Sequence, residues 1–390
     1  MSGPLGILEL SGGGGGRSGG ALRRREAGYL PQGNDIKVED RLVRQLGLRT
    51  GDEIVGETRR GKGGSFLERV TLLNGRPPEE LRERPEFQNL PAVHPDQPLR
   101  LECGSARPGG GQADQTNRII DLVCPFGKGQ RALIVASAKG GKTMVLQAIA
   151  EGVSTNYPDA ALFILLVDER PEEVFEIEAA GFGEVVASSF DNPAAQHVAL
   201  AELLLERARR RVELGDDVVL IVDSLTRLAR AHNAVVKGTG RTLSGGLDAQ
   251  ALERPKRFFG SARQVDPARA GGAGGGGSLT IIATALVDTG SKMDDLIFEE
   301  FKGTGNSELV LSRELAERRV FPAINLVASG TRKEELLLSG PALVASHKLR
   351  QRIARMSPLD AMNDLLTDLR RHKTNAELIA ALAGTEGAKA

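Results

Sequence analysis

The hydrophobic positions of this chain follow two different patterns, and the change falls near residue 117. Through about residue 75, short apolar runs alternate with turn residues at close spacing, as in LGILEL, GYL, DIKV, DEIVGETRR and SFLERVTLL. Short strands with frequent turns are typical of small β-barrels. The pattern therefore predicts a small all-β domain over residues 1–75.

From residue 118 onward, near-continuous apolar runs such as RALIVA, ALFILLVDE, DVVLIVDS and SLTIIATALVD alternate with stretches of helical periodicity. Strands of this kind alternating with helices are typical of a parallel sheet covered on both faces. The pattern predicts an α/β domain over residues 118–390, with binding residues at the carboxyl ends of its strands. Residues 76–117, rich in Pro, Glu, Arg and then Gly, are predicted to be a connector.

Two further segments are interpreted from local composition. The glycine-rich insert over residues 271–277 precedes an apolar strand and predicts a surface loop. The tail TNAELIAALAG predicts a final amphipathic helix, with Thr374 or Asn375 as its N-cap.

Composition narrows the class of protein. Hydrophobic residues make up 40% of the 390 positions and aromatic residues only 4%, so the predicted core is large and mostly aliphatic. The formal net charge of zero argues against a polybasic protein that coats nucleic acid, but it leaves room for a locally basic channel.

The absence of a recognisable secretory signal and the spacing of the cysteines favour a cytoplasmic location. The start of the chain has no charged region followed by a long apolar run, and the apolar stretch at 160–167 is too short to span a membrane. Cys103 and Cys124 are far apart in the sequence and form no CxxC pair, which argues against a disulfide framework or a zinc site.

The most specific motif is ASAKGGKT at residues 136–143, between the apolar strand ALIV and the helical run TMVLQAIAEG. A phosphate-binding P-loop requires this strand–loop–helix context. Backbone N–H groups of the loop and of the helix N-terminus can surround a phosphate. Lys142 is expected at the β- and γ-phosphates of ATP and Thr143 on Mg²⁺, although Ala136 replaces the first glycine of the motif. An ordinary glycine-rich turn is the alternative.

Two further strands end in carboxylates. DVVLIVDS ends in Asp223, which can hold Mg²⁺ through its hydration shell. ALFILLVDE ends in Glu169, which is placed to orient or deprotonate an attacking water. An acidic turn without a catalytic role is the alternative for both strand ends.

Beyond these motifs, long strings of the chain resemble the Rho family of bacterial transcription termination factors. They read VDERPEEV, GEVVASSFDNPAAQHV, VDSLTRLARAHNAVV, RPKRFFGSAR, LTIIATALVDTGSKMDDLIFEEFKGTGN and RVFPAINLVASGTRKEELL. The resemblance is almost unbroken from about residue 118 to 340 and weak over residues 1–75. It implies an α/β RecA-like P-loop ATPase domain preceded by an all-β OB-fold (cold-shock-like) RNA-binding domain.

The resemblance also implies roles for individual residues at an ATP site. Glu169 and Lys142 would be catalytic, together with Arg332 as an arginine finger that reaches the ATP of a neighbouring subunit and Arg319 as its assistant. A finger supplied by a neighbour makes catalysis depend on a ring, and the family implies a homohexamer.

The remaining implied residues of this site hold the nucleotide and its metal. Phe321 would stack on adenine, and Thr143 and Asp223 would serve Mg²⁺. The nucleotide would also be held by the P-loop residues Lys139, Gly140, Gly141, Lys142, Thr143 and Met144.

Two loops would line the central pore of such a ring, over residues 235–246 (VVKGTGRTLSGG) and 289–293 (TGSKM). Lys292 is expected to contact the RNA backbone, because a few cations among small residues suit a loop that holds phosphates without reading bases. Two flexible surface loops are the alternative. The implied RNA-contacting residues of the two loops are Lys292, Gly290, Ser291, Gly245 and Gly246.

The predicted barrel departs from the family where aromatic rings would stack on pyrimidine bases. The family has a GFGFLR-like strand, whereas this chain reads GGALRR at residues 19–24. Stacking is worth about 1–3 kcal/mol per base, so weaker or relocated RNA binding is expected. Tyr29 and Arg23 are the candidate RNA contacts here, and Tyr29 and Phe66 are the only aromatic residues before Phe87. Arginines 23–25 would either contact phosphates or form a solvated basic turn, and the sequence leaves both open.

The implied function is that of an ATP-dependent RNA translocase or helicase, an RNA-dependent ATPase. It would bind nascent single-stranded RNA, act on the RNA polymerase elongation complex to terminate transcription, and have no membrane partner. One alternative is an RNA-binding scaffold that has lost hydrolysis, which the presence of Lys142, Glu169 and Arg332 opposes. Another is a DNA recombinase or rotary ATPase subunit, which the TRKEE string opposes.

Overall fold

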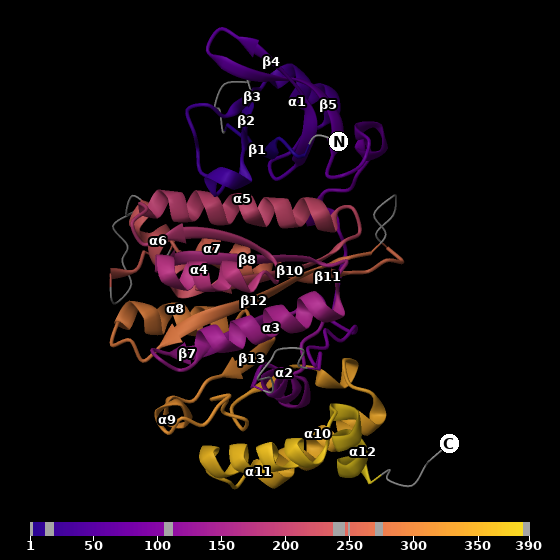
Figure 1. Cartoon of the computed structure of the whole chain (residues 1–390), viewed down its shortest axis with the longest axis vertical. Helices are drawn as coiled ribbons and strands as arrows, with labels where there is room; N and C mark the ends of the chain where they lie inside the picture. The colour runs from indigo at the N-terminus through magenta and orange to yellow at the C-terminus, as the bar shows by residue number, and fades with distance from the viewer. Residues whose placement is uncertain are drawn as a thin grey trace.

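The computed structural model describes residues 3–11, 19–104, 112–236, 246–248, 250–269 and 276–384. Most of the predicted pore loop at 235–246, including Gly245, lies outside the described residues, as does most of the glycine-rich insert at 271–277. Figure 1 shows a β-barrel at one end of the molecule, an α/β sheet in the middle and a group of helices at the other end.

The barrel at the N-terminal end is closed, with strand order β1-β2-β3-β5-β4. Its interior is filled by aliphatic side chains that alternate along the strands, such as Leu8, Leu22 and Ile54, each fully buried. This confirms the β-barrel that the short apolar runs predict. Its elements are β1 (Gly6–Leu10), β2 (Gly20–Arg23), η1 (Arg25–Ala27), β3 (Ile36–Val38), α1 (Asp40–Leu46), β4 (Glu53–Gly61) and β5 (Gly64–Leu73).

The central sheet has the strand order β14-β13-β7-β12-β10-β8-β9, and the strands from β13 to β9 run parallel. A short antiparallel strand, β11, pairs with β12 and with β6. The strands of this sheet are β6 (Ala92–Val93), β7 (Arg131–Ser137), β8 (Ala161–Glu169), β9 (Glu184–Ser189), β10 (Asp217–Asp223), β11 (Arg263–Val265), β12 (Ser278–Val287), β13 (Ser307–Val310) and β14 (Gly330–Thr331).

Helices cover both faces of the sheet, because side chains alternate along each buried strand. In β7, Ile134 packs into the core that contains α2 and α3, whereas Leu133 packs into the core that contains α5 to α8. This confirms the predicted α/β class. The helices are α2 (Gln112–Val123), α3 (Lys142–Asn156), α4 (Pro171–Ala180), α5 (Ala194–Val212), α6 (Leu225–Val235), α7 (Glu253–Gly260), α8 (Lys292–Lys302), α9 (Arg313–Glu317), α10 (Gly340–Ile353), α11 (Pro358–Arg371) and α12 (Asn375–Ala383).

The last of these helices begins where the sequence predicts. Thr374 is the N-cap of α12, and its hydroxyl accepts a hydrogen bond from the backbone N–H of Glu377 at 3.2 Å. Helices α10 to α12 pack against α2 and α3 in one apolar cluster. Among the described residues, no helix combines the length and the apolar character that crossing a bilayer requires.

The barrel lies against α5, which runs between it and the sheet (Figure 1). At Gly51 the barrel backbone comes so close to α5 that a β-carbon would lie 2.4 Å from the carbonyl carbon of Glu206. Arg207 of α5 donates hydrogen bonds to the Tyr29 hydroxyl at 2.8 Å and to Glu53 at 2.9 Å. It also pairs with Glu184 of β9. Arg207, whose side chain is only 13% exposed, therefore helps to join the barrel to the α/β sheet.

We expect Arg207→Met to lower the free energy of unfolding by about 2 kcal/mol or more, because it leaves Glu184, Glu53 and the Tyr29 hydroxyl without their shared cation. Chemical denaturation measures this change. Arg211→Met is the matched control, since Arg211 lies on the same helix and pairs with Asp216 near the surface. Equal destabilisation by the two substitutions would contradict the role of Arg207 at the junction.

Candidate nucleotide and RNA sites

The predicted P-loop connects the carboxyl end of β7 to the N-terminus of α3. Gly141 is the N-cap of α3 and has a φ of 84°, a conformation that favours glycine. Gly140 is buried, and a β-carbon there would lie 3.1 Å from the Ser137 carbonyl oxygen. Lys139 is exposed at a φ of 63°. The loop thus brings backbone N–H groups and the first turn of a helix together, which is the geometry of an anion site.

Lys142 is held between the two carboxylates that the strand ends predict. Its Nζ donates to Glu169 Oε1 at 2.8 Å and to Asp223 Oδ1 at 2.8 Å. Both carboxylates are 2% exposed. They meet because β7, β12, β10 and β8 are parallel neighbours, so their carboxyl ends lie at one edge of the sheet. Thr143 lies half-buried in the first turn of α3 beside them.

The charges at this edge depend on one another. Burial opposes the charge on Lys142, but the carboxylates of Asp223 and Glu169 outweigh burial and raise the pKa of the amine. Burial also raises the pKa of Asp223. For Glu169, burial acts in the same direction, but Lys142 and Arg227 outweigh it and hold the pKa of this carboxyl below its usual value. Glu169 is therefore ionised at neutral pH.

Three residues of this site do not figure in the sequence-based prediction. Arg227 Nη1 lies 3.3 Å from Glu169 Oε2, Glu173 of α4 shares a hydrogen bond with Glu169, and the Thr284 hydroxyl donates to Asp223 at 2.7 Å. Arg227 was accessible from sequence, because it is the third residue after Ser224, the N-cap that directly follows the DVVLIVD strand. Such a position faces back toward the strand ends.

Phe321 and Arg319 lie at the same edge as the P-loop. A β-carbon on Gly141 would be 3.6 Å from the Phe321 ring, so this ring borders the phosphate loop. Arg319 is exposed, with a φ of 58°, two residues earlier in the chain. Met144 is 41% exposed on the first turn of α3.

Arg332 lies at the opposite edge of the sheet. Its backbone N–H donates to the Asn306 carbonyl at 2.9 Å, and Asn306 in turn accepts from the backbone N–H of Arg131, the first residue of β7. The P-loop follows the other end of β7, and a strand of 7 residues spans about 20 Å. Arg332 therefore does not reach the P-loop of its own chain, and one chain does not bring it near Arg319.

The predicted RNA-binding residues after β12 lie at the P-loop edge, because Val287 of β12 pairs with Ser137 of β7. Gly290, Ser291 and Lys292 form the turn into α8, with Lys292 exposed. The turn is stabilised by Asp294, which accepts hydrogen bonds from the Thr289 hydroxyl at 2.6 Å and from Arg230 Nε at 2.8 Å. Gly246, at the described end of the other predicted loop, accepts a hydrogen bond from Asn233 at 3.2 Å.

The two predicted RNA contacts of the barrel, Tyr29 and Arg23, are both engaged with other side chains in the structure. Tyr29 is only 7% exposed and its hydroxyl donates to Glu184 at 2.5 Å, so its ring is not presented to RNA in this arrangement. We assign Tyr29 to the junction between the barrel and the sheet. Arg23 is paired with Glu9 and Asp35, each at 2.5 Å, which compensates its charge.

A different aromatic ring of the barrel is accessible. Phe66 of β5 is half-buried, and its ring has the Lys37 ammonium at 5.7 Å and the Arg59 guanidinium at 5.1 Å from the centroid. An aromatic face between two cations can hold a base and its phosphate together. We call these three residues the Phe66 cluster.

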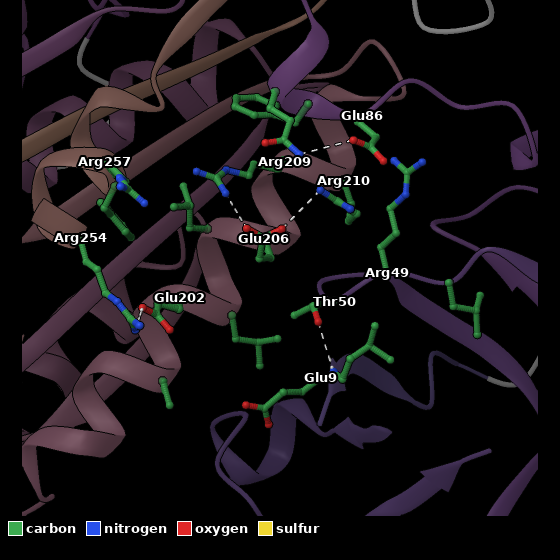
Figure 2. Close-up of a pocket in the computed structure, with 18 of the residues that line it drawn as sticks. Glu9, Arg49, Thr50, Glu86, Glu202, Glu206, Arg209, Arg210, Arg254 and Arg257 are labelled. Carbon is green, nitrogen blue, oxygen red and sulfur yellow. Dashed lines mark hydrogen bonds and ion pairs between the residues drawn. The ribbon is translucent and has the colours of Figure 1, made fainter. Parts of the chain in front are cut away.

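A cavity of about 920 Å³ lies away from the P-loop, between the barrel, α5 and α7 (Figure 2). Several of its arginines are paired with carboxylates: Arg209 and Arg210 both contact Glu206, and Arg254 contacts Glu202 at 3.1 Å. This pairing compensates part of the positive charge that lines the cavity. None of the sequence-predicted site residues lines this cavity.

Together, the P-loop and the carboxylates at the sheet edge define a RecA-like nucleotide-binding domain, joined here to a closed β-barrel. Two protein families match these parts. The ATP synthase alpha/beta family, nucleotide-binding domain, matches residues 116–331. The Rho termination factor, RNA-binding domain, matches residues 6–79. This chain belongs to the transcription termination factor Rho family.

Relatives named transcription termination factor Rho cover almost the whole chain. The protein from Gemmatimonas aurantiaca is 52% identical over 384 residues, which is 98% of this chain and 51% of the relative. That from Haemophilus influenzae is 52% identical over 361 residues, which is 92% of this chain and 83% of the relative. The chain thus spans about half the length of the first relative. The resemblance predicted from the sequence is confirmed.

Two solved structures share the fold. A type III secretion system ATPase is 24% identical, with a TM-score of 0.59 over 75% of this chain and 87% of that chain. The assembled ATPase EscN from enteropathogenic E. coli is 25% identical, with a TM-score of 0.55 over 74% of this chain and 63% of that chain. These structures and the family matches confirm the predicted fold class, whereas the roles of single site residues stay predictions.

Proposed function

We propose that this chain is an ATP-driven RNA translocase that terminates transcription as a ring of identical subunits. The observation that carries the proposal is the Lys142–Glu169–Asp223 arrangement beside a P-loop, in a chain of the Rho family that also has the matching barrel. The proposed partners are nascent single-stranded RNA and the RNA polymerase elongation complex, in the cytoplasm and as a homohexamer.

ATP hydrolysis would take place at the P-loop edge. Lys142 would contact the β- and γ-phosphates, with Lys139, Gly140 and Gly141 supplying backbone N–H groups. Phe321, which borders Gly141, would stack on adenine. Glu169, kept ionised by Lys142 and Arg227, would accept the proton of the attacking water.

Magnesium fits the residues at the same place. Thr143 offers a hydroxyl and Asp223 a buried carboxylate, which are the hard oxygen ligands that Mg²⁺ takes. Bound with ATP, the ion would neutralise charge on the phosphate oxygens. The Thr284 hydroxyl, which donates to Asp223, would keep this carboxylate oriented.

Glu169→Gln should keep nucleotide binding and lose hydrolysis by roughly 10²- to 10⁴-fold, because the amide retains the shape of the side chain but accepts no proton. Equilibrium binding of a fluorescent ATP analogue and single-turnover hydrolysis separate the two effects. Glu172→Gln, three residues later in the first turn of α4 and exposed, is the control. Parallel loss of binding and hydrolysis would instead indicate that Glu169 is structural.

The position of Arg332 supports a ring. Its guanidinium is exposed, about 20 Å along β7 from the P-loop of its own chain, and it pairs with no carboxylate in the described part of the chain. A cation in that position suits contact with a phosphate of a neighbouring subunit. Arg319 lies at the other edge of the sheet, beside the P-loop, so Arg319 and Arg332 of one chain would lie at different distances from that phosphate.

RNA would follow two surfaces, the Phe66 cluster on the barrel and the Gly290–Lys292 turn beside the ATP site. Few rings are available for stacking, so phosphate contacts should dominate. We expect the affinity for oligopyrimidine RNA to fall roughly tenfold or more between about 50 and 200 mM salt, as about three phosphate contacts require. Fluorescence anisotropy across a salt series measures this. Affinity that stays unchanged across the series would contradict the prediction.

One comparison separates the candidate functions. ATPase activity is measured with polypyrimidine RNA, with duplex DNA and without nucleic acid. Stimulation by RNA alone supports the proposal, stimulation by duplex DNA supports a recombinase-like motor, and RNA binding without any hydrolysis supports a scaffold.

A further inference from the structure

The strand β14 leads directly into Arg332. Hydrogen bonds of the Arg332 backbone and of the Thr331 side chain hold this segment in place. The backbone N–H of Arg332 donates to the Asn306 carbonyl at 2.9 Å. The Thr331 hydroxyl donates to the Pro125 carbonyl at 2.8 Å and lies 2.9 Å from the Ser307 hydroxyl. These contacts tie the segment to the start of β13 and to the chain that follows α2.

Arg350 of α10 reaches the same segment from another side. Its Nη1 donates to the Ser329 carbonyl at 3.1 Å and its Nη2 donates to the Val123 carbonyl at 2.6 Å. Nη2 also lies 3.4 Å from Glu334 Oε2. A β-carbon on Gly330 would lie 3.3 Å from Nη2, so the guanidinium packs directly on this glycine. A single side chain thus contacts residues on both sides of position 332 and joins them to the end of α2.

The segment needs such support. Lys333, immediately after Arg332, has a φ of 57°, a left-handed conformation that costs a residue other than glycine about 1–2 kcal/mol. Strained backbone of this kind persists only where its surroundings hold it in place. The Arg332 side chain itself is exposed, so its direction is set by the backbone from which it projects.

We propose that Arg350 is a positioning residue that fixes the backbone around Arg332 for contact with the ATP of a neighbouring subunit. The inference rests on the proposed role of Arg332 as an arginine finger. The planar fork of arginine can bond two carbonyls and a carboxylate at once, which a lysine ammonium at the same place does not do. A misplacement of about 1 Å at a catalytic group can reduce the rate roughly 100-fold.

The test compares Arg350→Met with Arg352→Met. Arg352 lies on the same helix with similar exposure, 33% against 29%, but its guanidinium pairs with Asp364 and Asp368 of α11 and not with the segment around Arg332 in the described structure. RNA-stimulated hydrolysis should show kcat lowered roughly 10- to 100-fold by Arg350→Met, with the KM for ATP unchanged, because the chain's own P-loop lies at the other edge of the sheet. Arg352→Met should leave both constants near wild type.

A double variant separates positioning from general stability. If Arg350 acts through Arg332, the Arg350→Met/Arg332→Ala variant has the same kcat as Arg332→Ala alone. A further 10- to 100-fold fall in the double variant would show that Arg350 acts elsewhere and overturn the inference. Equal kcat values for Arg350→Met and Arg352→Met, with Arg332→Ala inactive, would overturn the inference alone. Wild-type hydrolysis by Arg332→Ala would refute the finger itself, and the inference with it.

A second variant covers the case in which Arg350→Met does not fold. Gly330→Ala leaves Arg350 in place but pushes a β-carbon against its guanidinium. It should lower kcat by roughly 3- to 10-fold at unchanged KM, and have no effect in the Arg332→Ala background. A wild-type kcat in Gly330→Ala would overturn the inference.

Discussion

Lys142→Ala is expected to reduce ATP turnover by at least about 1000-fold, because the phosphates lose the cation that the P-loop presents to them. RNA-stimulated steady-state ATPase activity measures the effect. Lys373→Ala, which removes an exposed lysine near α12, serves as the control. Near-normal turnover by a folded Lys142→Ala protein would refute the site assignment.

The same substitution has a consequence for folding. Without Lys142, the buried carboxyls of Asp223 and Glu169 face each other with no cation between them. Burial already raises the pKa of Asp223 and loss of Lys142 removes a charge that opposes this rise, so the folded variant should bind a proton more readily than the unfolded chain. Its free energy of unfolding should therefore rise as the pH falls from neutral toward the usual range of aspartate. The folded state is accordingly confirmed by circular dichroism at the pH of the assay.

Arg332→Ala should also lower hydrolysis by on the order of 10³-fold or more, while ATP binding to the chain's own P-loop is retained. The decisive measurement mixes Arg332→Ala with Lys142→Ala subunits, each inactive alone. In a mixed ring, an Arg332→Ala subunit keeps a working P-loop and receives the arginine of a Lys142→Ala neighbour. We expect partial recovery of RNA-stimulated ATPase activity at intermediate mixing ratios, once subunit exchange is confirmed.

Absence of recovery at every ratio counts against a finger in trans, unless turnover requires every site to fire in sequence. A titration of wild type with Lys142→Ala decides between these explanations. Sequential firing gives a loss of activity steeper than linear, whereas independent sites give a linear loss.

The sequence predicts that the candidate ATP-site residues lie together, and the structure brings Lys142, Glu169 and Asp223 into contact. Glu169 and Asp223 stand at the ends of buried apolar strands, Lys142 follows another such strand after a short loop, and parallel strands bring these ends to one edge. The role of Thr284 is not predicted in this way. It lies within β12, and its contact with Asp223 depends on β12 and β10 being neighbours in the sheet, an order that hydrophobic periodicity does not encode.

The prediction of RNA contacts in the barrel has the same limit, because it does not include contacts between domains. Tyr29 and Arg23 were the RNA candidates because one is aromatic and the other basic, and these properties are local. Their surroundings in the structure come from elsewhere in the chain: Arg207 of α5 and Glu184 of β9 enclose Tyr29, and Asp35 pairs with Arg23. Packing of a barrel on a helix and pairing of charges across strands leave no periodic pattern in the sequence. An aromatic residue that the sequence suggests is exposed, such as Tyr29, can therefore lie in a junction between domains.

The bridge formed by Lys142 has a consequence for the proposed catalytic cycle. In the structure, the Lys142 ammonium lies beside the Asp223 and Glu169 carboxylates and supplies the positive charge that they require. If Asp223 serves Mg²⁺ as proposed, Lys142 would compete with the ion for this carboxylate from within the same chain. On this proposal, binding of ATP with Mg²⁺ would displace Lys142 from Asp223, and release of the product would restore the pair. Such competition would weaken the binding of product and so favour its release between rounds of hydrolysis.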